Sequence, residues 1–235
     1  MNQLISPDFF LSHQLDFHPV VRFNEKTDKI IEMDFSEGNT ELSSAILNDT
    51  NHFMNYINGK LHDAGALYGI GGYNEHRTVY SRSTVFDSHL PGEEPRRIHL
   101  GVDIWGQLNT PIFAPMDGLV YNFAFNNDFG DYGATIILSH NLEGQTFHTL
   151  YGHLCLNDIK NLEIGQHIDK GELFAEFGMP IENGHWPPHL HFQIITDMQG
   201  HEGDYPGVCS ISDRDKYLSN CPDPDLILQL NKYIS

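Results

Sequence analysis

Two histidines separated by a single residue, His189 and His191, begin an apolar segment that is typical of a β-strand. Side chains alternate between the two faces of a strand, so both imidazoles are expected on one face and Leu190 and Phe192 on the other, toward a core. Two imidazoles on a buried face each need a hydrogen-bond partner or a metal ion, because burying an unsatisfied polar ring is costly. The pair therefore indicates a polar site, or else two histidines on an exposed face.

A second mixed pair consists of His99 and Asp103, four residues apart with Gly101 between them. A bent strand or loop at the glycine would let the imidazole and the carboxylate converge. Two neutral imidazoles and one carboxylate, with a fourth position open to water, form the ligand set of a catalytic zinc site. Without a further observation, His99 and Asp103 also fit an ordinary polar pair.

A third candidate, His153, directly follows Gly152 at the end of an apolar run over residues 146–150. A histidine after a glycine at a strand end is well placed to point into a groove. The alternative is a histidine that is satisfied in the core or at the surface.

Four motifs together resemble the M23 (lysostaphin-type, LytM-like) zinc metalloendopeptidases, in the order that the family has. They are HLGVD at 99–103, TPIFAPMDGLV at 110–120, YGHL at 151–154 and PHLHF at 188–192. The resemblance covers about residues 69–197. It implies a mainly β fold, with antiparallel β-sheets in a barrel-sandwich arrangement around an open groove.

The resemblance also implies a role for each candidate residue. His99, Asp103 and His191 match the ligands of one Zn²⁺ ion, and His153 and His189 match the two non-ligand histidines that serve the reaction. The implied function is zinc-dependent hydrolysis of a peptide or amide bond, peptidoglycan-like or glycine-rich. All five positions hold the expected residue types, which argues against a pseudoenzyme. The alternative is a non-catalytic zinc-groove binding or regulatory module.

The chain has no H-E-x-x-H motif, in which a glutamate would act as the base. We therefore expect either His153 or His189 to accept the proton of the attacking water, and the other imidazole to stabilise the oxyanion as a donor. The choice between the two histidines stays open at this stage.

Two further segments are expected to shape the groove. Residues 72–77 (GYNEHR) resemble the aromatic-turn-arginine segment that precedes the first ligand in many family members. Residues 184–188 (GHWPP) are bulkier than the usual small-residue approach to H-x-H and are expected to narrow one end of the groove. The candidate groove residues are Tyr73, Asn74, Arg77 and His185.

The elements that must position these residues divide the chain into three predicted parts. Residues 1–66 form an N-terminal extension, irregular or in short strands to about residue 38, with one helix from Thr40 to about residue 65. Residues 67–200 form the metallopeptidase domain, with short apolar runs between turn residues and no strong helix from 111 to 195. Residues 201–235 form a tail that packs on the core and contains a short helix with Asp225 near its cap.

Composition limits the partners that the chain can have. The sequence contains 13 Lys and Arg residues against 32 Asp and Glu residues, a formal net charge of −19. Such a surface repels phosphates and anionic lipid headgroups, so neither nucleic acid nor a membrane is expected as a partner. We expect a peptide or a peptidoglycan fragment as substrate, while the oligomeric state stays open.

Three widely spaced cysteines, without a C-x-x-C pair, favour a reducing compartment. No secretory signal is visible, which predicts a cytoplasmic location, or a periplasmic or secreted one if a leader was removed. The tail motifs at 206–208 and 221–224 resemble M23-like domains of cytoplasmic multidomain proteins that also carry kinase-like and aminotransferase-like domains. This narrower resemblance argues against a role in degrading the cell wall.

Overall fold

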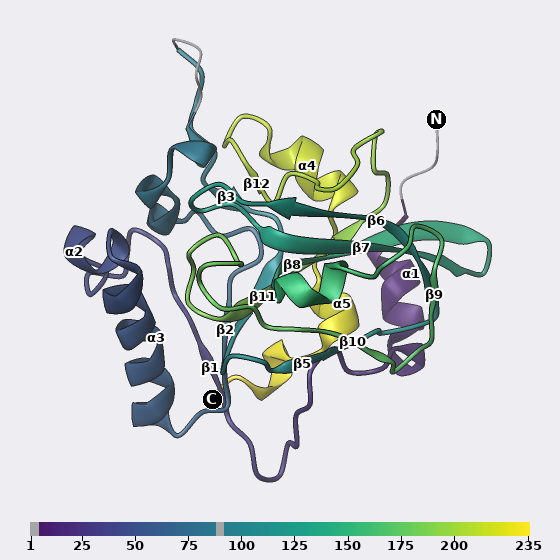
Figure 1. The fold of residues 1–235 in the computed structure, drawn as a ribbon, viewed down its shortest axis with the longest axis horizontal. Helices are drawn as coiled ribbons and strands as arrows, with labels where there is room; N and C mark the ends of the chain where they lie inside the picture. Colours follow the sequence, from purple (N-terminus) through teal and green to yellow (C-terminus); the bar gives the residue numbers. More distant parts are fainter. Residues whose placement is uncertain (1–4, 88–91) are drawn as a thin grey trace.

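The computed structural model describes residues 5–87 and 92–235 of the chain. Its centre is an eight-stranded mixed sheet with the strand order β1-β2-β4-β11-β8-β7-β6-β9 (Figure 1). The strands of this sheet, in that order, are Ile30–Glu32, Tyr68–Gly71, Val102–Trp105, His189–Ile195, Gln145–Leu154, Gly133–Leu142, Gly118–Asn126 and His167–Ile168. Two small antiparallel pairs accompany it: β5 (Pro111–Phe113) with β10 (Leu173–Glu176), and β3 (Ile98–His99) with β12 (Val208–Cys209).

The predicted mainly β class is confirmed, and the strand pairing adds two details to the predicted arrangement. Strands β1 and β2 pair in parallel, whereas the other pairs of the large sheet are antiparallel. Among the described residues no pairing joins β9 back to β1, so the large sheet is not a closed barrel. The parallel pair arises because the chain returns from β1 to β2 through a long helical crossover.

Helices flank this sheet. Figure 1 shows α3 on one side of the sheet and α1 on the opposite side. The α-helices are α1 Pro7–Ser12, α2 Ser44–Leu47, α3 Thr50–Ala64, α4 Arg214–Asn220 and α5 Asp225–Leu228. Short 3₁₀ helices occupy Gln14–Asp16, Thr78–Arg82, Thr84–Phe86, Leu156–Ile159 and Asn231–Tyr233. In the described part of the chain, none of the helices has the length and apolarity that crossing a membrane requires.

The helix predicted from Thr40 is divided into α2 and α3, each with its own N-cap. The side chain of Ser43 accepts a hydrogen bond from Ile46 N, and that of Asp49 accepts one from His52 N. Each cap satisfies a free amide at a helix start, so two short helices replace the one that was predicted. The predicted end is confirmed, because Gly65 closes α3 with a left-handed backbone at φ 60°.

Two other helices were not predicted. Helix α1 lies where irregular or short-strand structure was expected, although Ser6 caps it and Pro7 occupies its first turn. Helix α4 also had no counterpart in the sequence prediction. The expected closing helix is present as α5, which has only four residues. The division at residues 66 and 200 remains a prediction.

Candidate active site

Three of the predicted site residues bring their side-chain donors together in the interior. His99 Nε2 lies 2.9 Å from His191 Nδ1 and 3.3 Å from Asp103 Oδ1, and the last two atoms are 3.1 Å apart. Ligands of a tetrahedral site with bonds of about 2.0–2.1 Å are roughly 3.3 Å apart. All three residues are buried, and their geometry is that of a group that could hold one metal ion.

The register of the central strands explains this convergence. Strand β11 lies between β4 and β8, and its residue His191 stands directly opposite Asp103 on β4. Gly101 lies against the His191 ring, where an added Cβ would be 2.5 Å from Cε1. The glycine between the two ligand candidates is therefore needed for the close approach of His191.

Strand β11 separates a polar face from an apolar one, as its sequence predicted. Leu190 and Phe192 are completely buried in the main hydrophobic cluster. His189 and His191 line a cavity on the other face of the strand. The alternative of two exposed histidines is excluded, since each is no more than 3% exposed.

The imidazole of each ligand candidate, His99 and His191, uses its second nitrogen as a hydrogen-bond donor. His99 Nδ1 donates to the carbonyl oxygen of Gly72 at 3.1 Å, which leaves the lone pair on Nε2. His191 Nε2 donates to Gln193 Oε1 at 3.0 Å, which leaves the lone pair on Nδ1. The amide orientation of Gln193 is fixed because its Nε2 donates to the carbonyl oxygen of Pro206. Both free lone pairs therefore face the convergence point.

Asp103 is held by a buried arginine. Arg77 Nη1 donates to Asp103 Oδ2, and Arg77 Nε donates to Glu75 Oε2 at 2.7 Å. Burial raises the pKa of Asp103, but the nearby His99 and Arg77 lower it more, so that its pKa lies well below the ordinary value. Asp103 is thus a carboxylate, and its Oδ1 is left for a metal ion.

His153 and His189 form a second pair beside the ligand candidates. His153 Nδ1 donates to the carbonyl oxygen of Asn183, and His189 Nδ1 donates to that of Pro187, each at 2.8 Å. The rings stack with centroids 4.1 Å apart, and His189 also stacks on Trp105 at 3.8 Å. Burial lowers the pKa of His189 to about 4 and that of His153 well below its usual value. Both rings are therefore neutral, with an unprotonated Nε2.

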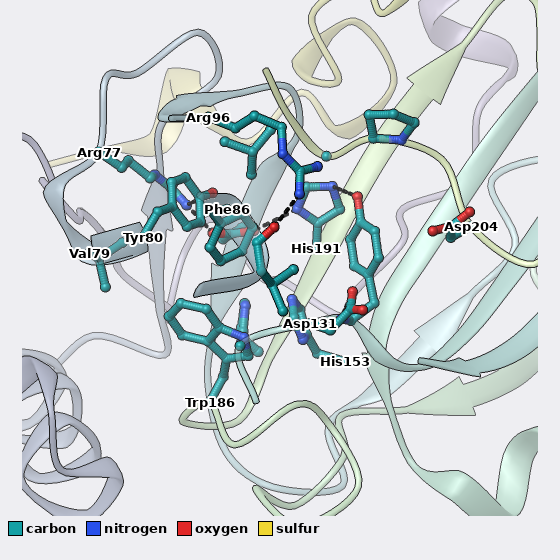
Figure 2. A pocket seen from close by; sticks show the side chains of 18 of the residues that line it. Arg77, Val79, Tyr80, Phe86, Arg96, Asp131, His153, Trp186, His191 and Asp204 are labelled. Atoms are coloured by element: carbon teal, nitrogen blue, oxygen red, sulfur yellow. Dashed lines mark hydrogen bonds and ion pairs between the residues drawn. The ribbon is translucent and has the colours of Figure 1, made fainter. Parts of the chain in front are cut away.

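A cavity of about 190 Å³ is lined by Asp103, His153, His189 and His191. Figure 2 shows His191, His153 and Trp186 around it, together with Tyr80 and Phe86 from the segment that follows Arg77. Residues 204–208 of the tail also line the cavity. The site is thus a pocket with one apolar wall of aromatic side chains, next to the ligand candidates.

Some of the candidate groove residues line the cavity and others lie away from it. Arg77 lines the cavity, yet it is only 1% exposed and binds Asp103. Tyr73 and Asn74 are not among the lining residues. The Tyr73 hydroxyl donates to the carbonyl oxygen of Cys221, and Asn74 Oδ1 accepts a hydrogen bond from Arg214 Nε. Those two side chains therefore attach to the tail of the chain.

His185 also does not line the cavity, and it stacks on Phe129 with centroids 5.5 Å apart. Its neighbour Trp186 lines the cavity instead. The sequence indicates that residues 184–188 are bulky, but no pattern in it singles out Trp186. Gln193 was also missed, although strand alternation places it on the same face as His191. No sequence signal pointed to Tyr132, whose hydroxyl lies 3.5 Å from His191 Nε2.

Comparison with known proteins agrees with this site. The family model for peptidase family M23 matches residues 97–203, a segment that contains all five site residues. Residues 97–203, a little under half of the chain, therefore match peptidase family M23, and the predicted family resemblance is confirmed. The narrower resemblance to cytoplasmic multidomain proteins stays a prediction.

Two curated relatives match part of the chain. It is 37% identical over 99 residues to a protein of Haemophilus influenzae named "Uncharacterized metalloprotease", covering 42% of this chain and 18% of that protein. It is 32% identical over 127 residues to the L-Ala–D-Glu endopeptidase of Bacillus subtilis, covering 52% of this chain and 36% of that protein. The matched segment thus spans less than a fifth of the first relative and little more than a third of the second.

Among solved structures, the catalytic domain of the antimicrobial peptidase lysostaphin from Staphylococcus simulans is similar over 70% of this chain and 96% of that chain. The sequence identity is 18% and the TM-score is 0.39.

Proposed function

We propose that this protein is a zinc-dependent metallopeptidase that hydrolyses a peptide or amide bond. The observation that carries the proposal is the convergence of His99 Nε2, Asp103 Oδ1 and His191 Nδ1 beside two neutral histidines. The matched peptidase family and the names of the two curated relatives support a metallopeptidase over other classes of enzyme.

The donor set fits zinc. Zinc accepts imidazole nitrogen and carboxylate oxygen, and three protein ligands with one open position are characteristic of its catalytic sites. The second nitrogen of each imidazole is occupied by Gly72 or Gln193, which orients the ring as a ligand requires. Bound there, a zinc ion would polarise the substrate carbonyl and lower the pKa of a coordinated water to about 7.

The chain's own histidines would move the protons. Because Nδ1 of both His153 and His189 is committed to a backbone carbonyl, each neutral ring presents Nε2 as an acceptor. One of them takes the proton of the water whose oxygen adds to the substrate carbonyl carbon. The imidazolium then donates that proton to the leaving amine as the C–N bond breaks.

This tautomer changes one expectation from the sequence. A neutral His153 or His189 with its proton on Nδ1 has no donor at Nε2 for an oxyanion. Either ring becomes such a donor only after it has been protonated. We therefore assign the donor role to the imidazolium that proton transfer creates.

The substrate that we propose is a peptide or a peptidoglycan fragment with glycine or D-amino acid links. The Bacillus subtilis relative is named for cleavage of an L-Ala–D-Glu bond, which supports this class. A pocket lined by aromatic side chains beside the two histidines would hold a short extended peptide.

The test combines metal analysis with hydrolysis of glycine-rich and D-amino acid peptides, with and without a chelator. We expect about one zinc ion per chain and hydrolysis that the chelator abolishes and zinc restores. Asp103→Ala should lose the metal, whereas a change at the exposed His167 on β9 should not. Zinc and peptide binding without hydrolysis of any peptide would instead identify a non-catalytic binding module.

A further inference from the structure

Trp186 presents a hydrogen-bond donor that the protein does not use. The side chain lines the cavity and is only 4% exposed, yet its Nε1 has no partner among the described residues. An indole N–H can only donate, and a buried donor without an acceptor is costly. Trp105, the other tryptophan of the sequence, lines the same cavity, and its Nε1 also lacks a partner within the described part of the chain.

The loop that carries Trp186 also holds both histidines of the proposed reaction. The carbonyl oxygens of Asn183 and Pro187 accept the Nδ1 hydrogens of His153 and His189. Trp186 lies between those two residues in sequence, and its ring is 6.2 Å from each imidazole, edge to face. One short loop therefore sets the distance between the indole and the two histidines.

Asn183 fixes the backbone of Trp186 from both sides. Trp186 N donates to Asn183 Oδ1 at 3.0 Å, and Asn183 Nδ2 donates to the carbonyl oxygens of Trp186 and Gly178. Asn183 is completely buried. The indole is thus held on a rigid support, as a group that positions a ligand should be.

Arg82 holds the other side of the indole. Its guanidinium carbon lies 4.7 Å from the Trp186 ring centroid and 4.9 Å from that of Phe129. A cation over the ring face is attracted to the π system and keeps the indole in place. Because a guanidinium has donors only, Arg82 cannot accept the indole hydrogen.

The site is rich in acceptors beside this donor. His153 and His189 both present an unprotonated Nε2, and Asp103 is a carboxylate. A peptide in the cavity must place its carbonyl oxygens against donors. We propose that the Trp186 indole N–H donates to a backbone carbonyl oxygen of the bound peptide, which makes Trp186 a substrate-binding residue. This inference rests on the proposed peptidase function and adds a specific contact to it.

The chain's tryptophan content allows a direct test. In ¹⁵N-tryptophan-labelled, zinc-loaded protein, the two indole signals can be assigned with Trp186→Phe and Trp105→Phe. The probe is a phosphinic analogue of tetraglycine, in which a PO₂–CH₂ unit replaces one amide. We expect the Trp186 indole proton to move downfield on saturation, and by more than that of Trp105. Binding that leaves the Trp186 proton unmoved would overturn the inference, as would a failure to bind the analogue.

Affinity provides the second measurement. Trp186→Phe keeps an aromatic ring but removes the donor, so the dissociation constant for the phosphinic peptide should rise about 2- to 10-fold. The zinc content and the thermal midpoint should stay close to those of the wild type, which separates lost binding from lost structure. Equal losses in Trp186→Phe and Trp105→Phe would also reject a specific role for Trp186.

The two proposals fail in different ways. A wild-type protein that binds the analogue with the expected indole shift, but hydrolyses no peptide, would refute the peptidase function and keep the Trp186 contact. Zinc-dependent hydrolysis with an unchanged Trp186 signal and unchanged affinity in Trp186→Phe would support the peptidase function and refute the Trp186 contact.

Discussion

Gln193 accepts a hydrogen bond from His191 Nε2 at 3.0 Å and thereby fixes which nitrogen of that imidazole faces His99 and Asp103. The same amide donates to the carbonyl oxygen of Pro206 and to the thiol of Cys221. A single side chain thus ties the ligand candidate on β11 to the C-terminal tail. The tail contributes to the metal site through this contact as well as through the lining of the cavity.

Replacing Gln193 by leucine should weaken metal binding without removing a ligand. His191 would lose its acceptor and could adopt the other tautomer, with a proton on Nδ1. Loss of such a supporting contact typically costs about 10- to 100-fold in metal affinity. Competition titration with a chromogenic chelator measures this, with the exposed Gln145→Leu on β8 as the matched control. Equal affinities in the two variants would show that Gln193 does not orient His191.

Replacing Arg77 by methionine should destabilise the metal-free protein strongly. Asp103 would keep a buried negative charge without its cation, a change that typically costs about 3–5 kcal/mol. Urea unfolding at neutral pH measures the loss. The matched control is Lys60→Met, because Lys60 pairs with Glu41 at the surface, where both side chains are at least 40% exposed. The control should cost less than about 1 kcal/mol, and a similar cost in both variants would contradict the argument.

Removing the stacked histidine that acts as the base should slow the reaction strongly but spare the metal. His153→Ala and His189→Ala each delete an Nε2 acceptor, and general acid–base catalysis is typically worth about 10²- to 10⁴-fold in rate. Zinc content should stay near one ion per chain in both variants. Turnover numbers with the best peptide substrate, set against His167→Ala, provide the comparison. A variant that keeps full turnover would remove that histidine from the proposed mechanism.

Acid should destabilise the fold through a histidine outside the site. Burial lowers the pKa of His140 to about 4, while its Nδ1 donates to the carbonyl oxygen of Asp117. Between its pKa in the unfolded chain, about 6.5, and its pKa in the folded protein, only the unfolded state binds the proton. Stability is therefore retained above pH 6.5 and falls as the pH decreases toward 4.

The contribution of His140 alone should be about 2 kcal/mol between pH 7 and pH 5. Urea unfolding of the metal-free protein at the two pH values measures it. His140→Gln is expected to be less stable at pH 7 and to lose less stability on acidification than the wild type. If the wild type and His140→Gln lose the same stability between pH 7 and pH 5, His140 does not titrate in this way.

Much of the fold class could be read from local patterns. The alternation in β11 predicted the core positions of Leu190 and Phe192, and the turn residues between short apolar runs predicted a mainly β chain. The first residues of the helices were harder to predict from the sequence, because Ser43 and Asp49 compete with Thr40 as N-caps within a few residues. Such local competition is decided by packing rather than by propensity.

The residue types at the candidate site were determined by the sequence itself: imidazoles at 99, 153, 189 and 191, a carboxylate at 103, and two histidines on one strand face. Tertiary structure decided which atoms meet. His99 and Asp103 are 92 and 88 positions away from His191; the pairing of β4 with β11 places Asp103 opposite His191, and the short connection from β3 to β4 brings His99 beside them. Hydrogen bonds to Gly72, Gln193, Asn183 and Pro187 decide which nitrogen of each imidazole is free. Contacts with Arg82 and Asn183 hold the Trp186 indole, whose N–H is unused, in its position. Contacts of this kind follow from strand register and side-chain packing, which no local pattern in the sequence specifies.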